Sequence, residues 1–148
     1  EHSIDWHLLD DARHRGLLDL NRDLNRMYAD LGALHASDCD PAGFAWIDLH
    51  SADQSVFAFL RSDPTQPQSP PIVCVFNATP VPRDQYWIGV PEGGTYARLL
   101  DSDTERYGGT GYSKQDRATA DAYPSHGYPF RLRLDLPPLA ALFFRLER

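Results

Sequence analysis

Proline is distributed very unevenly along this chain of 148 residues. All 12 prolines lie at position 41 or later, and the first 40 residues contain none. Because proline breaks the interior of a helix and interrupts central strands, it limits where long elements can form. The first 40 residues can therefore hold a long helix, whereas the remainder favours short segments separated by turns.

The proline-free part has the apolar spacing of a helix. Apolar side chains recur at steps of three and four, while charged residues fill the other faces. This apolar face consists of Leu17, Leu20, Leu24, Met27 or Tyr28, and Leu31. We predict one amphipathic helix over residues 11 to 32, with Asp10 and Asp11 suited to its start and Gly32 to its end. Gly16 weakens its first turn by roughly 1 kcal/mol relative to alanine.

From Phe44 onward the apolar period changes to two, which is typical of strands. Phe130–Leu136 alternates strictly, so one face should lie on a core and the other in water. Ile72–Phe76 is continuously apolar and should be covered on both faces. No helix for a crossover connection is evident, so we predict a mainly β protein, an antiparallel sandwich of seven to eight strands preceded by the helix. The expected strands are Phe44–Leu49, Ser55–Arg61, Ile72–Phe76, Tyr86–Val90, Thr95–Leu100, Phe130–Leu136 and Ala140–Leu146.

Two segments interrupt this pattern of short strands. Residues 63–71 contain four prolines, which predicts an exposed, mobile connection. Residues 101–129 form a long insertion rich in Gly, Tyr, Asp and Ser. Insertions of that length in a compact domain are usually functional or disordered.

Charge and composition exclude several classes of partner. The 14 basic and 21 acidic residues give a net charge of −7, which opposes nucleic acid and anionic membrane surfaces. There is no apolar run of about 18 residues and no export signal, which favours a cytoplasmic protein. The chain begins at Glu1 and its only methionine is Met27, so we expect it to be a piece of a larger protein. Cys39 and Cys74 lie outside metal or redox spacings and are expected to be buried or incidental thiols.

The motifs of catalysis and metal binding are missing from the sequence. There is no GxSxG, HExxH or Walker loop. Asp101, Asp103 and Glu105 resemble the opening of a calcium loop, but Arg106 stands where glycine is needed and Tyr112 where the closing glutamate belongs. We therefore predict solvated loop carboxylates, no metal and no cofactor. The histidines are scattered and are expected to be surface or hydrogen-bonded groups: His2, His7, His14, His35, His50 and His126.

Aromatic rings outside the strands are candidates for stacking on sugar rings, with ordinary packing as the alternative for each. These candidates are Trp6, Tyr107, Tyr112, Tyr123 and Tyr128. Trp46 and Trp87 lie within expected strands, where core packing is favoured.

Short sequence words spread over nearly the whole chain carry a resemblance to a known family. The specific ones are Asp5-Trp6-His7-Leu8-Leu9, Arg22-Asp23-Leu24-Asn25, Asn77-Ala78-Thr79-Pro80-Val81-Pro82-Arg83, Ile88-Gly89-Val90-Pro91, Tyr107-Gly108-Gly109 and Leu136-Pro137-Pro138-Leu139-Ala140. With these words the chain resembles the C-terminal end of bacterial glycogen (1,4-α-glucan) branching enzymes, members of the α-amylase superfamily.

The resemblance implies an enzyme with an N-terminal β-domain, a catalytic (β/α)8 barrel and a C-terminal sandwich. It implies that residues 1–40 are the last barrel helix and a linker, and that residues 41–148 are the sandwich. A barrel takes about 250 residues, so the catalytic carboxylates would lie upstream and none can be assigned here. We expect this chain alone to be inactive. Its implied partners are α-glucan and the missing barrel.

The resemblance also implies a reaction and a candidate site. Such an enzyme cleaves an α-1,4 bond and transfers the freed segment to a 6-hydroxyl with retention, through a covalent glycosyl-enzyme. Trp6 would lie near the mouth of the cleft. Together with the loop tyrosines Tyr107 and Tyr112, it makes up the set of candidate substrate-binding residues.

Three alternatives and one consequence stay open. The chain could be a stand-alone carbohydrate-binding or interaction module, a structural support without glucan sites, or part of a trehalose-forming hydrolase, against which Thr79–Arg83 argues. If a barrel is missing, the apolar helix face should cause self-association or collapse of the helix onto the sandwich.

Overall fold

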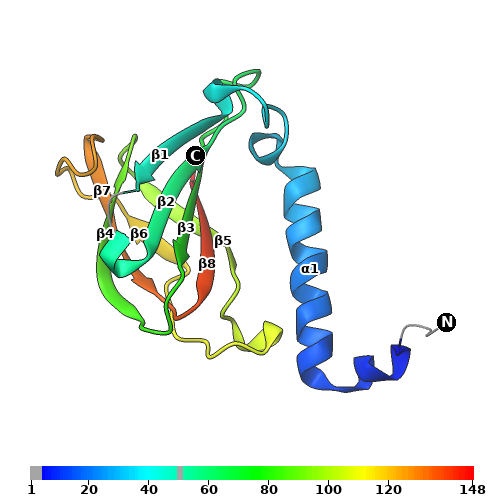
Figure 1. The fold of residues 1–148 in the computed structure, drawn as a ribbon. Helices are drawn as coiled ribbons and strands as arrows, with labels where there is room; N and C mark the ends of the chain where they lie inside the picture. Colours follow the sequence, from blue (N-terminus) through cyan, green and yellow to red (C-terminus); the bar gives the residue numbers. More distant parts are fainter. Residues whose placement is uncertain (1–4, 50–51) are drawn as a thin grey trace.

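A computed structural model describes residues 5–49 and 52–148 of the chain. It consists of two antiparallel sheets and one long helix that stands beside them (Figure 1). The predicted fold class, a mainly β sandwich preceded by one amphipathic helix, is confirmed.

Helix α1 spans Ala12–Asp30, close to the predicted range. Its N-terminus is capped by Asp11, whose carboxylate accepts a 2.8 Å hydrogen bond from the backbone N–H of Arg13. A 3-10 turn, η1 (Trp6–Asp10), precedes the helix, and another, η2 (Gly32–Leu34), follows it. The helix therefore ends before Gly32, and the chain changes direction at this residue.

The larger sheet has, within the described residues, six strands in the order β1-β2-β3-β8-β5-β6. All neighbouring pairs are antiparallel. The strands are β1 Phe44–Asp48, β2 Val56–Arg61, β3 Ile72–Asn77, β5 Thr95–Asp101, β6 Arg117–Thr119 and β8 Ala140–Leu146. The smaller sheet pairs β4 (Arg83–Val90) with β7 (Phe130–Leu136).

The main core lies between the two sheets. Leu132, Leu134 and Leu136 of β7 are fully buried, while Arg131, Arg133 and Asp135 alternate with them. This confirms the period of two predicted for β7. Facing these leucines are buried side chains of the larger sheet, among them Val73, Val75, Leu142 and Phe144.

A second apolar cluster lies on the opposite face of the larger sheet, beneath helix α1. Ile72, Cys74 and Phe143 of the sheet meet Leu20, Leu24, Met27 and Leu31 of the helix there. Strand β3 is thus covered on both faces, as its sequence predicts. Leu17, predicted to share the apolar face, is 58% exposed because the helix turns it away from the sheet.

The loops are more ordered than the sequence suggests. The insertion at 101–129 contains the short strand β6 and a 3-10 turn, η5 (Glu105–Tyr107), neither of which was predicted. Strand β6 has three residues, too few for a recognisable period, and forms because its backbone pairs with β5. In the segment 63–71, Asp63 is buried rather than exposed, since its carboxylate accepts hydrogen bonds from Thr65.

The remaining short turns are η3 (Pro41–Gly43), just before β1, and η4 (Ala52–Gln54), just before β2. A domain boundary between residues 40 and 41 stays a prediction. Among the described residues, no helix has the length and apolar character needed to cross a membrane.

Candidate functional site

The structure places the three predicted sugar-binding aromatics on different elements. Trp6 lies in η1 before the helix and is 69% exposed. Tyr107 is the last residue of η5 and contacts the middle of helix α1. Tyr112 lies in the same loop, but its hydroxyl bonds to Asp84 of β4. No common sugar-binding surface is formed by the three rings.

Tyr107 fastens this loop to helix α1. Its hydroxyl donates a 2.7 Å hydrogen bond to the carboxylate of Asp23, which also pairs with Arg106 at 2.9 Å. Burial, followed by the bond to Asp23, raises the pKa of Tyr107 to about 12. At the same contact, a Cβ added to Gly16 would lie 2.7 Å from the carbonyl carbon of Tyr107. Glycine at this position permits the close approach of helix and loop.

The carboxylates of the resembled calcium loop are internal acceptors. Asp103 accepts hydrogen bonds from the backbone N–H and the hydroxyl of Thr110, at 2.9 and 2.6 Å, and from the N–H of Tyr112 at 3.2 Å. Asp101 pairs with Arg98 at 3.0 Å. Both aspartates are buried, so the prediction of solvated carboxylates is wrong for them.

The tryptophans in strands were also predicted wrongly. Trp46 lies on the edge strand β1, packs edge-on against Phe44 and Phe59, and is 46% exposed. Trp87 points away from the core, and the guanidinium of Arg131 lies 3.8 Å from its ring centre. In a strand, alternate side chains point to opposite faces of the sheet, and a shift of one residue exchanges the two faces. Membership of a strand therefore did not imply that a tryptophan is buried.

Two further ring candidates lie in the loop before β7. Tyr123 is 58% exposed, and Arg131 lies 4.2 Å from its ring centre. Tyr128 is partly buried, packs against the main core and donates a 3.4 Å hydrogen bond to the carbonyl of Trp46. Tyr128 therefore has a packing role, whereas the ring of Tyr123 stays largely exposed beside Arg131.

Metal-ligating side chains do not cluster in the residues that the structure describes. His126, predicted to be hydrogen-bonded, accepts at Nδ1 from the N–H of Gly89 at 3.2 Å and contacts the hydroxyl of Ser125 at 2.8 Å. His7, His14 and His35 are exposed, as expected, whereas His2 and His50 lie outside the described residues.

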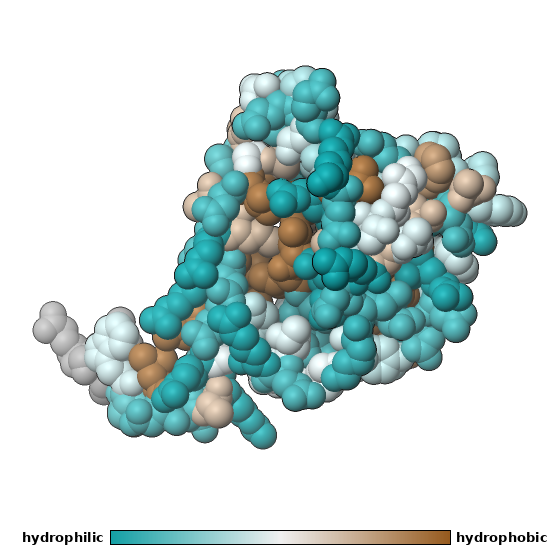
Figure 2. Space-filling view, turned by 180° about the vertical axis from the view of Figure 1, so that it is seen from behind, coloured by the Kyte–Doolittle hydropathy of each residue, from teal (hydrophilic) through white to brown (hydrophobic). Residues whose placement is uncertain are grey.

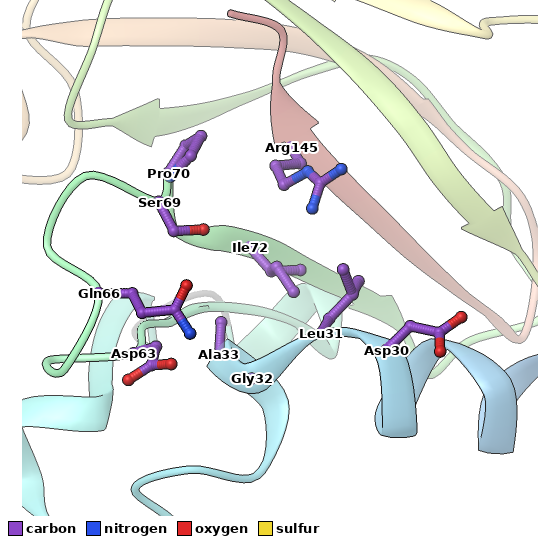
Figure 3. Close-up of a pocket in the computed structure, with 10 residues that line it drawn as sticks. All are labelled: Asp30, Leu31, Gly32, Ala33, Asp63, Gln66, Ser69, Pro70, Ile72 and Arg145. Atoms are coloured by element: carbon purple, nitrogen blue, oxygen red, sulfur yellow. The ribbon is translucent and has the colours of Figure 1, made fainter.

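A polar pocket of about 240 Å³ lies at the C-terminal end of α1 (Figure 3). It is bounded by the helix end, the proline-rich connection 63–71 and strand β8. The residues lining it are Asp30, Leu31, Gly32, Ala33, Asp63, Gln66, Ser69, Pro70, Ile72 and Arg145. Sequence reasoning missed this pocket, because its polar members come from three segments and follow no motif.

Asp63 is the most firmly held polar group of this pocket. Its Oδ1 accepts both the N–H and the hydroxyl of Thr65, at 2.9 and 2.6 Å. The hydroxyl bond is the main reason that the pKa of Asp63 lies below its usual value, despite the opposing effect of burial. Its Oδ2 lies where a side chain at Gly32 would begin, 2.7 Å from a Cβ added there.

An apolar hollow lies on another side of the helix end. Figure 2 shows hydrophobic residues on its floor, between the helix and the sandwich. Its cavity of about 370 Å³ is lined by Leu24, Met27, Phe59, Cys74 and Phe143, among others. The hollow marks where helix and sheet pack incompletely.

Comparison with known proteins gives one family. The model described as the α-amylase C-terminal all-β domain matches residues 46–147. The 1,4-α-glucan branching enzymes GlgB of Cereibacter sphaeroides, Aquifex aeolicus and Paramagnetospirillum magneticum are 48%, 42% and 47% identical to the chain. These matches cover 95%, 99% and 99% of the chain, but 19%, 23% and 20% of the relatives. The chain thus spans about a fifth of the length of the curated relatives it matches.

A solved structure, that of a MUTB mutant from crystals soaked with trehalulose, is similar at a TM-score of 0.48 and 18% identity. The similarity covers 86% of this chain and 17% of the other.

Proposed function

Because this chain belongs to the family of the α-amylase C-terminal all-β domain, we propose that it is the C-terminal part of a 1,4-α-glucan branching enzyme. The observation that carries the proposal is the high identity to three branching enzymes over nearly the whole chain, helix included. The whole enzyme would cleave α-1,4-glucan and transfer the freed segment to a 6-hydroxyl, forming the α-1,6 branches of glycogen. We propose the cytoplasm as its location.

In this proposal the chain supports the catalytic barrel and carries no catalytic group. Exposed apolar side chains near the start of the helix fit such a support, since a barrel packed there would cover them. Trp6 is 69% exposed, Leu17 is 58% exposed and Leu8 is 40% exposed. The helix α1, on this view, is the last helix of that barrel.

Trp6, Tyr107 and Tyr112 stay proposed glucan contacts, but they differ in how much of each ring is free to meet a sugar. Trp6 fits best, because its ring is exposed and makes no hydrogen bond with the described residues. Tyr107 and Tyr112 donate their hydroxyls to Asp23 and Asp84, so only their ring faces are available to a sugar.

A chimera tests the proposal. The chain replaces the aligned 23% of the Aquifex aeolicus enzyme, and branching of amylose is followed by the loss of iodine colour and by the α-1,6 signals in NMR spectra. We expect the chimera to branch amylose, and both the truncated enzyme and the 148-residue chain alone to be inactive.

Two results would contradict the proposal. One is a folded chimera no more active than the truncated enzyme, which would favour a stand-alone binding module. The other is turnover by the isolated chain, which would mean that it holds catalytic groups of its own.

A further inference from the structure

The polar pocket at the end of α1 contains hydrogen-bonding groups that have no partner in the fold. The side chains of Gln66, Ser69 and Arg145 make no hydrogen bond or ion pair within the described residues, although all three line the pocket. In Figure 3, these side chains point toward the space in front of Ile72. Together they offer an amide, a hydroxyl and a guanidinium to a single small volume.

The fold holds the backbone that carries these groups from two sides. Arg145 of β8 lies directly opposite Ile72 of β3 in the antiparallel register. Gln66 and Ser69 lie in a connection closed by two turns, in which the N–H of Gln66 donates to the carbonyl of Asp63 and that of Ser69 to the carbonyl of Gln66. The backbone around the pocket is therefore fixed by sheet register on one side and by turns on the other.

The charges of the pocket favour a neutral ligand. One arginine, Arg145, stands against two aspartates, Asp30 and Asp63, which gives a net charge of −1. Anions would meet the aspartates, and a cation would meet the guanidinium. Carboxylate, amide and guanidinium groups are planar and can each bond two neighbouring hydroxyls, so a polyhydroxyl compound uses all of them.

The pocket also has an apolar wall and a limited size. Leu31, Pro70 and Ile72 provide apolar surface beside the polar groups, which suits the C–H face of a sugar ring. Its volume of about 240 Å³ lies below the roughly 300–1,000 Å³ of pockets for drug-sized ligands, so it fits one ring rather than a stretch of chain. It is also more enclosed than the neighbouring apolar hollow.

We propose that this pocket binds the terminal glucose unit of an α-glucan chain, with Asp63, Gln66 and Arg145 bonding its hydroxyls. The identity of the sugar rests on the proposed function, whereas the choice of a polyhydroxyl ligand rests on the pocket itself. Binding of chain ends here would hold glycogen near the enzyme through a site that takes no part in the reaction.

The test compares two glucans with the same number of glucose units, one linear with chain ends and one cyclic without them. Maltoheptaose and β-cyclodextrin both contain seven α-1,4-linked glucose units, but only maltoheptaose has chain ends. Binding to the 148-residue chain is measured by titration calorimetry and by shifts of backbone amide signals. We expect maltoheptaose to bind and to shift the amides of Gly32, Gln66 and Arg145, and β-cyclodextrin not to bind there.

Matched variants locate the site. Arg145→Gln and Gln66→Ala should each weaken maltoheptaose binding about tenfold, the effect of losing one hydrogen bond to a charged or polar group in a preorganised site. Gly32→Ala should weaken binding because its added methyl group displaces Asp63. Arg133→Gln, which alters an exposed arginine on the smaller sheet, should leave the affinity unchanged.

The outcomes separate this inference from the proposed function. If maltoheptaose does not bind, if both glucans bind equally, or if the pocket variants bind like the Arg133→Gln control, the inference is wrong even where the chimera branches amylose. If the pocket binds maltoheptaose as described and the chimera is inactive, the site stands and the proposed function fails.

Discussion

Single buried carboxylates organise the loops of this chain. Asp103 accepts three hydrogen bonds that hold Thr110 and Tyr112 over it, and Asp63 accepts two from Thr65 in the other long connection. Each aspartate replaces backbone pairing that a loop lacks. At the residue scale, order in the connections therefore depends on a few acceptors.

Replacing Asp103 should loosen its loop. We expect Asp103→Ala to lower the free energy of unfolding by roughly 2–3 kcal/mol, because three donors lose a buried charged acceptor. Urea unfolding measures the loss, and hydrogen exchange should be faster at the amides of Thr110 and Tyr112. Glu105→Ala, at an exposed carboxylate nearby, is the matched control and should change stability little. Equal effects of the two substitutions would contradict the role given to Asp103.

The two thiols should react differently. Cys39 is exposed, whereas Cys74 is 1% exposed and burial raises its pKa to about 12. Since the thiolate is the reactive form, we expect Ellman's reagent to modify one thiol of the native chain and the second only after unfolding. The Cys39→Ser variant should have no rapidly reacting thiol. Rapid modification of both thiols in the native chain would show that Cys74 is not enclosed as described.

The hydroxyl of Tyr107 should make stability depend on alkaline pH. Its folded-state pKa of about 12 lies above the ordinary value of 10, so its contribution is complete below pH 10 and is lost as the pH rises toward 12. We expect Tyr107→Phe to be less stable by about 1 kcal/mol at pH 7. Unfolding by urea at several pH values should show a smaller loss between pH 10 and 12 in the variant. An identical pH profile for both chains would argue against the bond to Asp23.

At the scale of elements, one face of helix α1 contacts the rest of the chain from near its start to its end. Near its start Gly16 meets the backbone of Tyr107, and near its end Leu31 and Ala33 enter the apolar cluster of the larger sheet. Between these residues Leu20, Leu24 and Met27 also pack against the cluster, and the apolar hollow remains beside Leu24 and Met27. Gly16, a weak point by helix propensity alone, is thus a packing requirement.

Adding a methyl group at Gly16 tests this contact. In an exposed helix, Gly→Ala stabilises by about 1 kcal/mol. Here we expect Gly16→Ala to destabilise by roughly 1–3 kcal/mol, because the new Cβ would overlap the Tyr107 carbonyl and push η5 away. Asn25→Ala, at an exposed position of the same helix, serves as the control in thermal unfolding. An increase in stability for Gly16→Ala would mean that helix and loop are not in close contact.

At the scale of the whole molecule, Arg61 couples the helical part to the sandwich. From β2 it donates to the carbonyl of Ala33 at 3.3 Å and of Leu34 at 3.2 Å, and it pairs with Asp38. Its side chain is only 12% exposed. These bonds bring the segment after the helix against the sheet. The polar pocket and the apolar hollow lie beside this contact, at the helix end.

Removing the guanidinium should separate the two parts. We expect Arg61→Met to cost about 2–3 kcal/mol, since two carbonyls and a carboxylate lose a charged donor. Hydrogen exchange should become faster along α1 and stay slow in β3 and β8. Arg133→Met on the smaller sheet is the control. Faster exchange spread evenly over both parts would contradict a coupling role.

Self-association of the chain stays a prediction, which light scattering can test.

Local patterns in the sequence were sufficient for helix α1 and for the longer strands, but not for β6 or η5. The spacing of leucines predicted α1, and the alternation in Phe130–Leu136 predicted which side chains of β7 reach the core. Such periods predict structure because they repeat within one element and depend on its backbone geometry alone. The resemblance of the sequence words to branching enzymes was equally local, and the family match confirms the fold that they implied.

Tertiary structure alone decided the candidate pocket and the facing of several side chains. Asp63, Gln66 and Arg145 meet only because the chain leaves α1, returns through β2 and the proline-rich connection, and brings β8 beside β3. Trp46 is exposed because β1 is an edge strand, which its own residues do not specify. Contacts between distant residues depend on the path of the whole chain, and no local period encodes that path.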